Sequence, residues 1–274
     1  MKINLVHLAQ HPAPIRLGCF ILILLLLWLP FAIPIYSLID DSNLVSIVTM
    51  VVLYVEFIFL LKLWGKYVYQ ETHILRHYGL EISRLNGVDL LRGLAIGLIS
   101  VLMLFGLQGS LGLLVWQHPN GLLLKVVLEG LIVGSGVGFA EELLFRGWLL
   151  DELHRNYSPR VSLWIDAILF AALHFIKPLE AIIHTLPQFP ALVLLGLTQV
   201  WGKRWRRGRL GLPIGLHGGL VWGYYIINIG QLIKYSGQVP DWVTGVNNNP
   251  LQSVMGVLFM SILAWWMWGR KVKS

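Results

Sequence analysis

Two adjacent carboxylates, Glu141 and Glu142, interrupt an apolar run that extends from Phe139 to Gly147. A charged side chain at the centre of a bilayer costs about 2.5–3.5 kcal/mol on insertion scales, so such groups usually face a cavity or a charged partner. Glu142 and Arg146 are four residues apart, which places them on one helix face as an ion pair. Glu141 points about 100° away from Glu142 around the helix. We therefore predict that Glu142 and Arg146 support the structure, whereas Glu141 is available for chemistry.

Two histidines in later apolar runs, His174 and His217, can join Glu141 in one site. At 1.5 Å per residue the three groups lie on the order of 10–20 Å below the cytoplasmic ends of their helices. We expect them to meet inside a helix bundle, in a site that is open to water on the cytoplasmic side. A carboxylate beside an imidazole suits general base catalysis, and an imidazole N–H can stabilise an oxyanion.

The elements that must position these groups are membrane helices. The chain of 274 residues is 56% hydrophobic and 13% charged, with a mean hydropathy of +0.69. Soluble domains carry about 25% charged residues, and about 20 apolar residues cross a bilayer as a helix. We predict an all-α fold, a polytopic membrane helix bundle of about eight transmembrane helices, over Leu17–Ile39, Leu44–Trp64, Leu90–Val115, Leu122–Leu150, Val161–Ile176, Ile182–Trp201, Leu210–Ile229 and Leu251–Trp268.

The basic residues predict how these helices are oriented. Most of the 21 Lys and Arg residues fall at one end of the arrangement, including Lys2, Lys271 and Lys273, whereas Asp40 and Asp41 fall at the other. Because positively charged loops remain in the cytoplasm, we expect an integral, multi-pass membrane protein with both termini cytoplasmic. Orientation also accounts for the net charge of +7, and we predict no nucleic-acid partner.

We expect one integrated membrane domain in three parts. Residues 1–121 form N-terminal helices with a cytoplasmic amphipathic connection, residues 122–229 form the core with the three ionisable groups, and residues 230–274 form an outer loop and the last helix. The connection from Gly65 to Asp89 mixes charged and apolar residues, which predicts an interfacial helix. Pro187 and Pro190 predict an irregular helix that protein neighbours must surround.

Other polar or small residues in these runs have a structural interpretation. Lys125 and Glu129 are spaced as a helical ion pair, and Asp166 is expected near the mouth of the cytoplasmic cavity. Glycines at short intervals allow helices to approach closely, and those with such spacing are Gly93, Gly97, Gly134, Gly136 and Gly138.

Three motifs on consecutive predicted helices carry a family resemblance. Glu141-Glu142-x-x-x-Arg146 is followed by Phe170-x-x-x-His174 and then by His217. This order resembles the CAAX protease and bacteriocin-processing (CPBP or Abi) family of intramembrane proteases, over about 122–229. The resemblance implies an eight-helix fold and an endopeptidase similar to CAAX prenyl protease 2, either glutamate-type or metal-dependent.

The resemblance also implies a role for each residue of the site. Glu141 and His174 would activate water, and His217 would stabilise the oxyanion, with Glu142, Arg146 and Phe170 in supporting positions. Prenyl-protein proteases of this family have asparagine four residues after the third motif, where this chain has Val221. Asn228 lies about 16 Å from His217 along the helix axis, which is too far to replace that asparagine. The second oxyanion donor is therefore unassigned.

The preferred interpretation requires no cofactor. If zinc is bound, Glu141, His174 and His217 are the expected ligands. The expected partners are the lipid bilayer and a membrane-associated protein or peptide substrate, lipidated or not, that is cleaved in a peptide bond. Two alternatives remain open at this point: a noncatalytic membrane scaffold with the same fold, and a transporter or proton relay.

Overall fold

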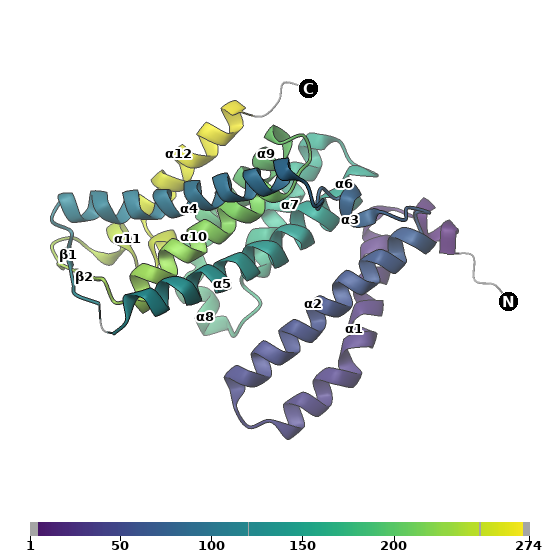
Figure 1. Ribbon diagram of the computed structural model, residues 1–274, viewed down its shortest axis with the longest axis horizontal. Coiled ribbons are helices and arrows are strands. Elements are labelled where there is room, and N and C mark those ends of the chain that lie inside the picture. Colours follow the sequence, from purple (N-terminus) through teal and green to yellow (C-terminus); the bar gives the residue numbers. More distant parts are fainter. Residues whose placement is uncertain (1–4, 120, 247, 271–274) are drawn as a thin grey trace.

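Helices account for nearly all regular structure in the computed structural model, which describes residues 5–119, 121–246 and 248–270. Lys2, Lys271 and Lys273, three of the residues used to orient the chain, lie outside the described residues. The elements in chain order (Figure 1) are a 3₁₀-helix Leu5–Gln10, α1 Ala13–Leu38, α2 Ser42–Tyr67, α3 Ile74–His77, α4 Arg84–Ser110, β1 Leu114–Trp116, α5 Leu123–Glu142, a π-helix Leu143–Leu149, α6 Leu150–His154, α7 Pro159–Leu173, α8 Leu179–Thr185, a 3₁₀-helix Leu186–Gln188, α9 Phe189–Trp205, α10 Gly211–Ile229, β2 Ile233–Tyr235, α11 Asp241–Thr244, a 3₁₀-helix Pro250–Gln252 and α12 Val254–Arg270.

The helices are those of an integral, multi-pass membrane protein, and the predicted all-α bundle is confirmed. Five helical segments are long and apolar enough to cross a bilayer, namely Ala13–Leu38, Ser42–Tyr67, Arg84–Ser110, Leu123–His154 and Leu179–Trp205. Each of the eight predicted ranges overlaps a helical segment, although some extend beyond its end. That all eight cross the membrane, with both termini cytoplasmic, stays a prediction.

Helix α10 lies between α4 and α5, and glycines on these helices make the contacts close. A methyl group added at Gly134 or Gly138 of α5 would lie 2.5 Å from a backbone oxygen of α10. Gly93 and Gly97 of α4 face α10 backbone atoms at equally close range. The predicted packing role is confirmed for these four glycines. It is wrong for Gly136, which has nothing within 4 Å of such a methyl group.

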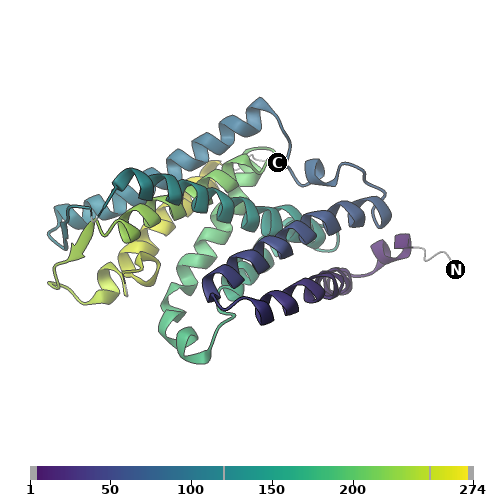
Figure 2. The same cartoon turned by 60° about the horizontal axis from the view of Figure 1, so that its bottom comes forward.

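Helices α1 and α2 form an antiparallel pair beside this bundle (Figures 1 and 2). Their anchor is Arg16, whose Nε donates to Glu152 Oε2 of α6 at 2.8 Å, with both side chains 1% exposed. Arg16 Nη1 also donates to Asn156 Oδ1 at 2.9 Å. Tyr69 donates its hydroxyl to the same Glu152, and burial together with that carboxylate raises the pKa of Tyr69. A buried charge pair therefore ties the N-terminal helices to the rest of the protein.

Connections that are distant in sequence and rich in basic residues meet at one end of the bundle. Arg206 and Arg209 both pair with Asp89, at 3.2 Å and 2.8 Å, and the backbone N–H of Leu210 donates to the carbonyl of Gly79. The 65–89 connection differs from the predicted interfacial helix. Between the end of α2 and the start of α4 it contains only the four-residue helix α3, and its Ile74 and Tyr78 side chains are buried in the core. It packs against protein because these apolar side chains join the core cluster.

Two further features differ from or refine the predicted helices. Residues 114–116, placed at the end of a predicted span, form β1, which pairs antiparallel with β2. This small sheet joins the connections after α4 and after α10 at the opposite end of the bundle. The irregular start predicted from Pro187 and Pro190 is confirmed, because α8 and α9 are separated by a 3₁₀ turn at Leu186–Gln188.

Candidate active site

The two glutamates end α5 at the point where the backbone widens into a π-helix, Leu143–Leu149. Short π-helical segments inside α-helices occur frequently at functional sites, because the extra residue per turn re-aims the side chains around it. Glu142 is fully buried, whereas the Glu141 side chain is 30% exposed. Adjacent residues of a helix point about 100° apart, so one carboxylate is buried while the other reaches a cavity, directly before the helix type changes.

Glu142 forms the predicted ion pair with Arg146, with Arg146 Nε 3.4 Å from Glu142 Oε2. Arg146 Nε is also 3.4 Å from Asp166 Oδ2, and all three side chains are 0% exposed. The expectation that Asp166 lies at a cavity mouth is therefore wrong: the guanidinium draws it into a buried cluster. Lys203 joins the cluster by donating to the backbone carbonyl of Arg146 at 2.6 Å.

His217 lies in the middle of α10 and contacts both glutamates. Its Nδ1 is 2.8 Å from Glu142 Oε1, and its Nε2 is 3.8 Å from Glu141 Oε2. Because the carboxylate of Glu142 accepts, His217 Nδ1 carries the proton. Glu142 thus does more than pair with Arg146, since it also orients one of the site histidines.

His174 directly follows α7, as its C-cap residue, and Phe170 orients its ring. The backbone carbonyl of Phe170 accepts a hydrogen bond from His174 Nδ1 at 2.7 Å, which leaves the Nε2 lone pair of a neutral ring pointing away. The Phe170 ring packs edge-on against His174 at a centroid distance of 4.8 Å, and the Arg146 guanidinium lies 4.3 Å from the Phe170 centroid. Phe170 therefore connects the buried cluster to the histidine.

Glu141 Oε2 lies between the two histidines. It is 3.9 Å from His174 Nε2 and 3.8 Å from His217 Nε2. This oxygen is buried and has no hydrogen-bond partner among the described residues. Separations beyond about 3.5 Å accommodate a bridging water, which can lie about 2.8 Å from each atom. The structure therefore brings together Glu141, His174 and His217, as the sequence predicted.

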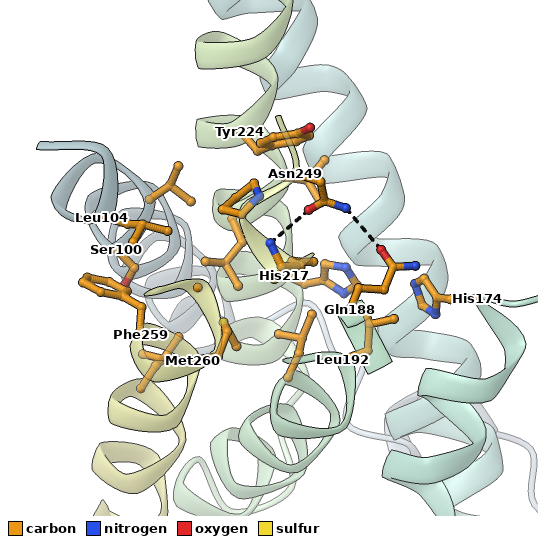
Figure 3. Close-up of a pocket in the computed structure, with 18 of the residues that line it drawn as sticks. Ser100, Leu104, His174, Gln188, Leu192, His217, Tyr224, Asn249, Phe259 and Met260 are labelled. Carbon is orange, nitrogen blue, oxygen red and sulfur yellow. Dashed lines mark hydrogen bonds between the residues drawn. The ribbon is translucent and has the colours of Figure 1, made fainter. Parts of the chain in front are cut away.

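The three groups line a cavity of about 270 Å³ whose other walls are mainly apolar (Figure 3). From His217 the lining continues along α10 through Leu220 and Tyr224, toward β2. On the other side of the site, toward the basic connections, the buried Arg146 and Asp166 fill the interior. The cavity lining therefore extends away from the charged cluster that supports the site. That the site is open to water on the cytoplasmic side stays a prediction.

Two carboxamides in the cavity wall, Gln188 and Asn249, were missed by the sequence analysis (Figure 3). Asn249 Nδ2 donates to Gln188 Oε1 at 3.2 Å. Pro187 and Pro190 signalled the helix break that carries Gln188, but nothing in the sequence relates Asn249 to the site. Val221 lines this cavity too, whereas Asn228 lines a different one beside β2.

The three-residue set does not have the spacing of a tetrahedral zinc site. Zinc holds nitrogen and oxygen ligands at about 2.0–2.2 Å, so two ligand atoms lie about 3.4 Å apart. The separations of Glu141 from the histidines are larger, at 3.9 Å and 3.8 Å. Among the described residues, no group of three or more His, Cys, Asp or Glu side chains is placed to hold a metal ion. Zinc dependence and the absence of a required cofactor both stay predictions.

In a comparison with protein families, residues 119–223 match the family of type II CAAX prenyl endopeptidases described as Rce1-like. No curated protein and no solved structure matches the chain. The matched segment contains Glu141, His174 and His217, and it confirms the resemblance to the CPBP family.

Proposed function

We propose that this protein, whose matched segment is that of a CAAX-type intramembrane protease, hydrolyses a peptide bond with Glu141 as general base. The observation that carries the proposal is the position of Glu141 Oε2, which is unpaired and lies 3.8–3.9 Å from two imidazole nitrogens. This arrangement suits one bound water held by a carboxylate and a histidine. General base catalysis requires the base within hydrogen-bond reach of the proton that it removes.

The reaction then follows from the orientation of each side chain. Glu141 takes a proton from the water as the water oxygen bonds to the scissile carbonyl carbon, while the lone pair of His174 Nε2 accepts the second water proton in a hydrogen bond. The carbonyl oxygen becomes an oxyanion. The proton on Glu141 passes to the leaving nitrogen, the C–N bond breaks, and an amine and a carboxylic acid are released. Glu141 is thereby restored.

His217 is the first donor to the oxyanion. Its Nδ1–H is held by Glu142, which orients the ring so that Nε2 faces the Glu141 side of the cavity. Donation to the oxyanion requires a proton on Nε2 as well, and the adjacent carboxylate of Glu142 would balance the resulting charge. Oxyanion stabilisation by oriented donors is often the largest single contribution to catalysis. Glu142 acts through His217 and is a positioning residue.

The apolar cavity supports a membrane-associated substrate. Leu104, Leu192 and Phe259 are among the side chains that line it together with the histidines. We propose that these walls accept an apolar side chain or a lipid tail of the substrate, including a prenyl group. Apolar walls with few polar groups provide affinity through burial and leave orientation to the polar groups.

Cleavage of a fluorogenic CAAX-type peptide by the protein in proteoliposomes tests this function. Glu141→Gln is expected to abolish cleavage, because the neutral amide cannot take the proton. Glu129→Gln is the matched control: it removes an exposed carboxylate that pairs with Lys125 on the same helix. Cleavage rates of a farnesylated and an unmodified peptide of the same sequence show which substrate class the protein prefers. Unchanged cleavage by Glu141→Gln would refute the assignment.

The two alternative functions rest on separate observations. A transporter requires polar groups that continue across the bilayer, whereas the walls beyond the histidines are mainly apolar. The departure at Val221 is the observation that favours a noncatalytic scaffold. Full rescue of the cellular function by a Glu141→Gln, His174→Ala double variant would establish the scaffold and exclude the protease.

A further inference from the structure

We propose that Gln188 donates a side-chain N–H to the oxyanion, and that Asn249 holds the Gln188 carboxamide in the orientation that this requires. The inference rests on the proposed endopeptidase function and assigns the second donor of its site. Gln188 would be a catalytic residue and Asn249 a positioning residue.

The hydrogen bonds determine which end of each carboxamide faces the cavity. The backbone N–H of Leu251 donates at 3.0 Å to Asn249 Oδ1. A backbone N–H can only donate, so this atom of Asn249 must be the oxygen. The Asn249 NH₂ group therefore points to Gln188 and requires its oxygen at 3.2 Å. The Gln188 NH₂ group remains, and among the described residues no other hydrogen bond engages this carboxamide.

The Gln188 NH₂ group lies in the wall of the catalytic cavity. Gln188 and the three ionisable groups line the same cavity, and Figure 3 shows the Gln188 carboxamide between Asn249 and His174. Gln188 is 8% exposed. Its Nε2 is not among the buried side-chain atoms that lack a hydrogen-bond partner, so this N–H donor keeps access to the cavity. A donor in this position therefore suits a substrate oxygen that enters the cavity.

The local backbone presents both residues to the cavity. Gln188 ends the 3₁₀ turn that separates α8 from α9, and Asn249 precedes the 3₁₀-helix Pro250–Gln252. These two turns are in contact. Irregular backbone at membrane depth is tolerated where it is buried in protein or lines a cavity. The carboxamide pair thus supplies polar groups to a cavity that Val221 lines without one.

Three variants test the inference with the peptide assay. Gln188→Ala is expected to lower kcat by about 10²–10³-fold with little change in KM, as for loss of one oxyanion donor. Asn249→Ala leaves the Gln188 amide free to rotate, so its NH₂ group faces the cavity only part of the time. About a tenfold loss of kcat is therefore expected for this variant. Asn249→Asp is expected to be worse than Asn249→Ala. The new carboxylate accepts from the Gln188 NH₂ group and turns the Gln188 oxygen toward the oxyanion.

Controls separate this inference from the function on which it rests. Asn228→Ala, on α10 but in a different cavity, should keep wild-type kcat. Thermal unfolding in detergent should show folded protein for every variant. If Glu141→Gln is inactive while Gln188→Ala stays within twofold of wild type, or if Asn249→Asp is no worse than Asn249→Ala, the carboxamide assignment alone is overturned. If the wild type cleaves no peptide, the protease function is overturned together with it.

Discussion

Substitution of Gly138 by alanine should separate the glutamates from His217 without changing any polar group. Gly138 is three residues before Glu141 on α5, and it packs against α10 close to His217. An added methyl group would lie 2.5 Å from the backbone oxygen of Ile214 and 2.8 Å from the backbone nitrogen of Gly218. Both neighbours are backbone atoms of a buried helix, so they cannot rotate away as a side chain would.

The size of the effect follows from these distances. To restore an ordinary contact of 3.4 Å, α5 and α10 must move apart by roughly 0.9 Å, at an overpacking cost of about 1–3 kcal/mol. The bond between His217 Nδ1 and Glu142 Oε1, now 2.8 Å, would lengthen beyond hydrogen-bond range. A misplacement of about 1 Å can reduce catalysis about 10²-fold. We expect Gly138→Ala to lower kcat by about that factor and to lower the Tm.

Gly136→Ala on the same helix is the matched control. Its methyl group would meet nothing within 4 Å, and alanine favours the helix by about 0.8–1.0 kcal/mol over glycine. The control should therefore keep wild-type cleavage in the proteoliposome assay and have an equal or higher Tm in detergent. Equal activity of the two variants would refute the idea that the contact between α5 and α10 sets the geometry of the site.

Two further predictions concern the buried charges. Arg16→Ala leaves Glu152 buried without its partner, so it should destabilise the protein by about 3–5 kcal/mol. The loss should be seen as a lower Tm and as faster proteolysis between α2 and α4. An unchanged Tm would contradict the anchoring role. Arg146→Ala should destabilise the protein by about the same amount, and it should also lower kcat because Glu142 loses its ion-pair partner. A wild-type kcat with a lowered Tm would show that Arg146 contributes to stability alone. Lys125→Ala breaks an exposed pair and should leave both quantities unchanged.

Local sequence patterns were sufficient for the helices and for part of the site. Apolar runs predict buried or membrane helices because hydrophobicity is repeated along a single element, and all eight predicted ranges overlap helical segments. The pair Glu142–Arg146 followed from a spacing of four residues, which brings side chains together on any helix. The shared depth of Glu141, His174 and His217 could be counted along each helix in the same way.

Contacts between distant elements could not be obtained from such patterns. Glu142 meets His217 across 75 residues because glycines let α5 and α10 approach closely, and spacing had assigned Glu142 only to Arg146. Asn249 reaches Gln188 across 61 residues because the loop after α10 folds back over the cavity. The sequence by itself determined which helices carry charged groups and at what depth. Only the tertiary structure decided which of these groups touch and on which side the cavity extends, because both depend on how the helices pack together.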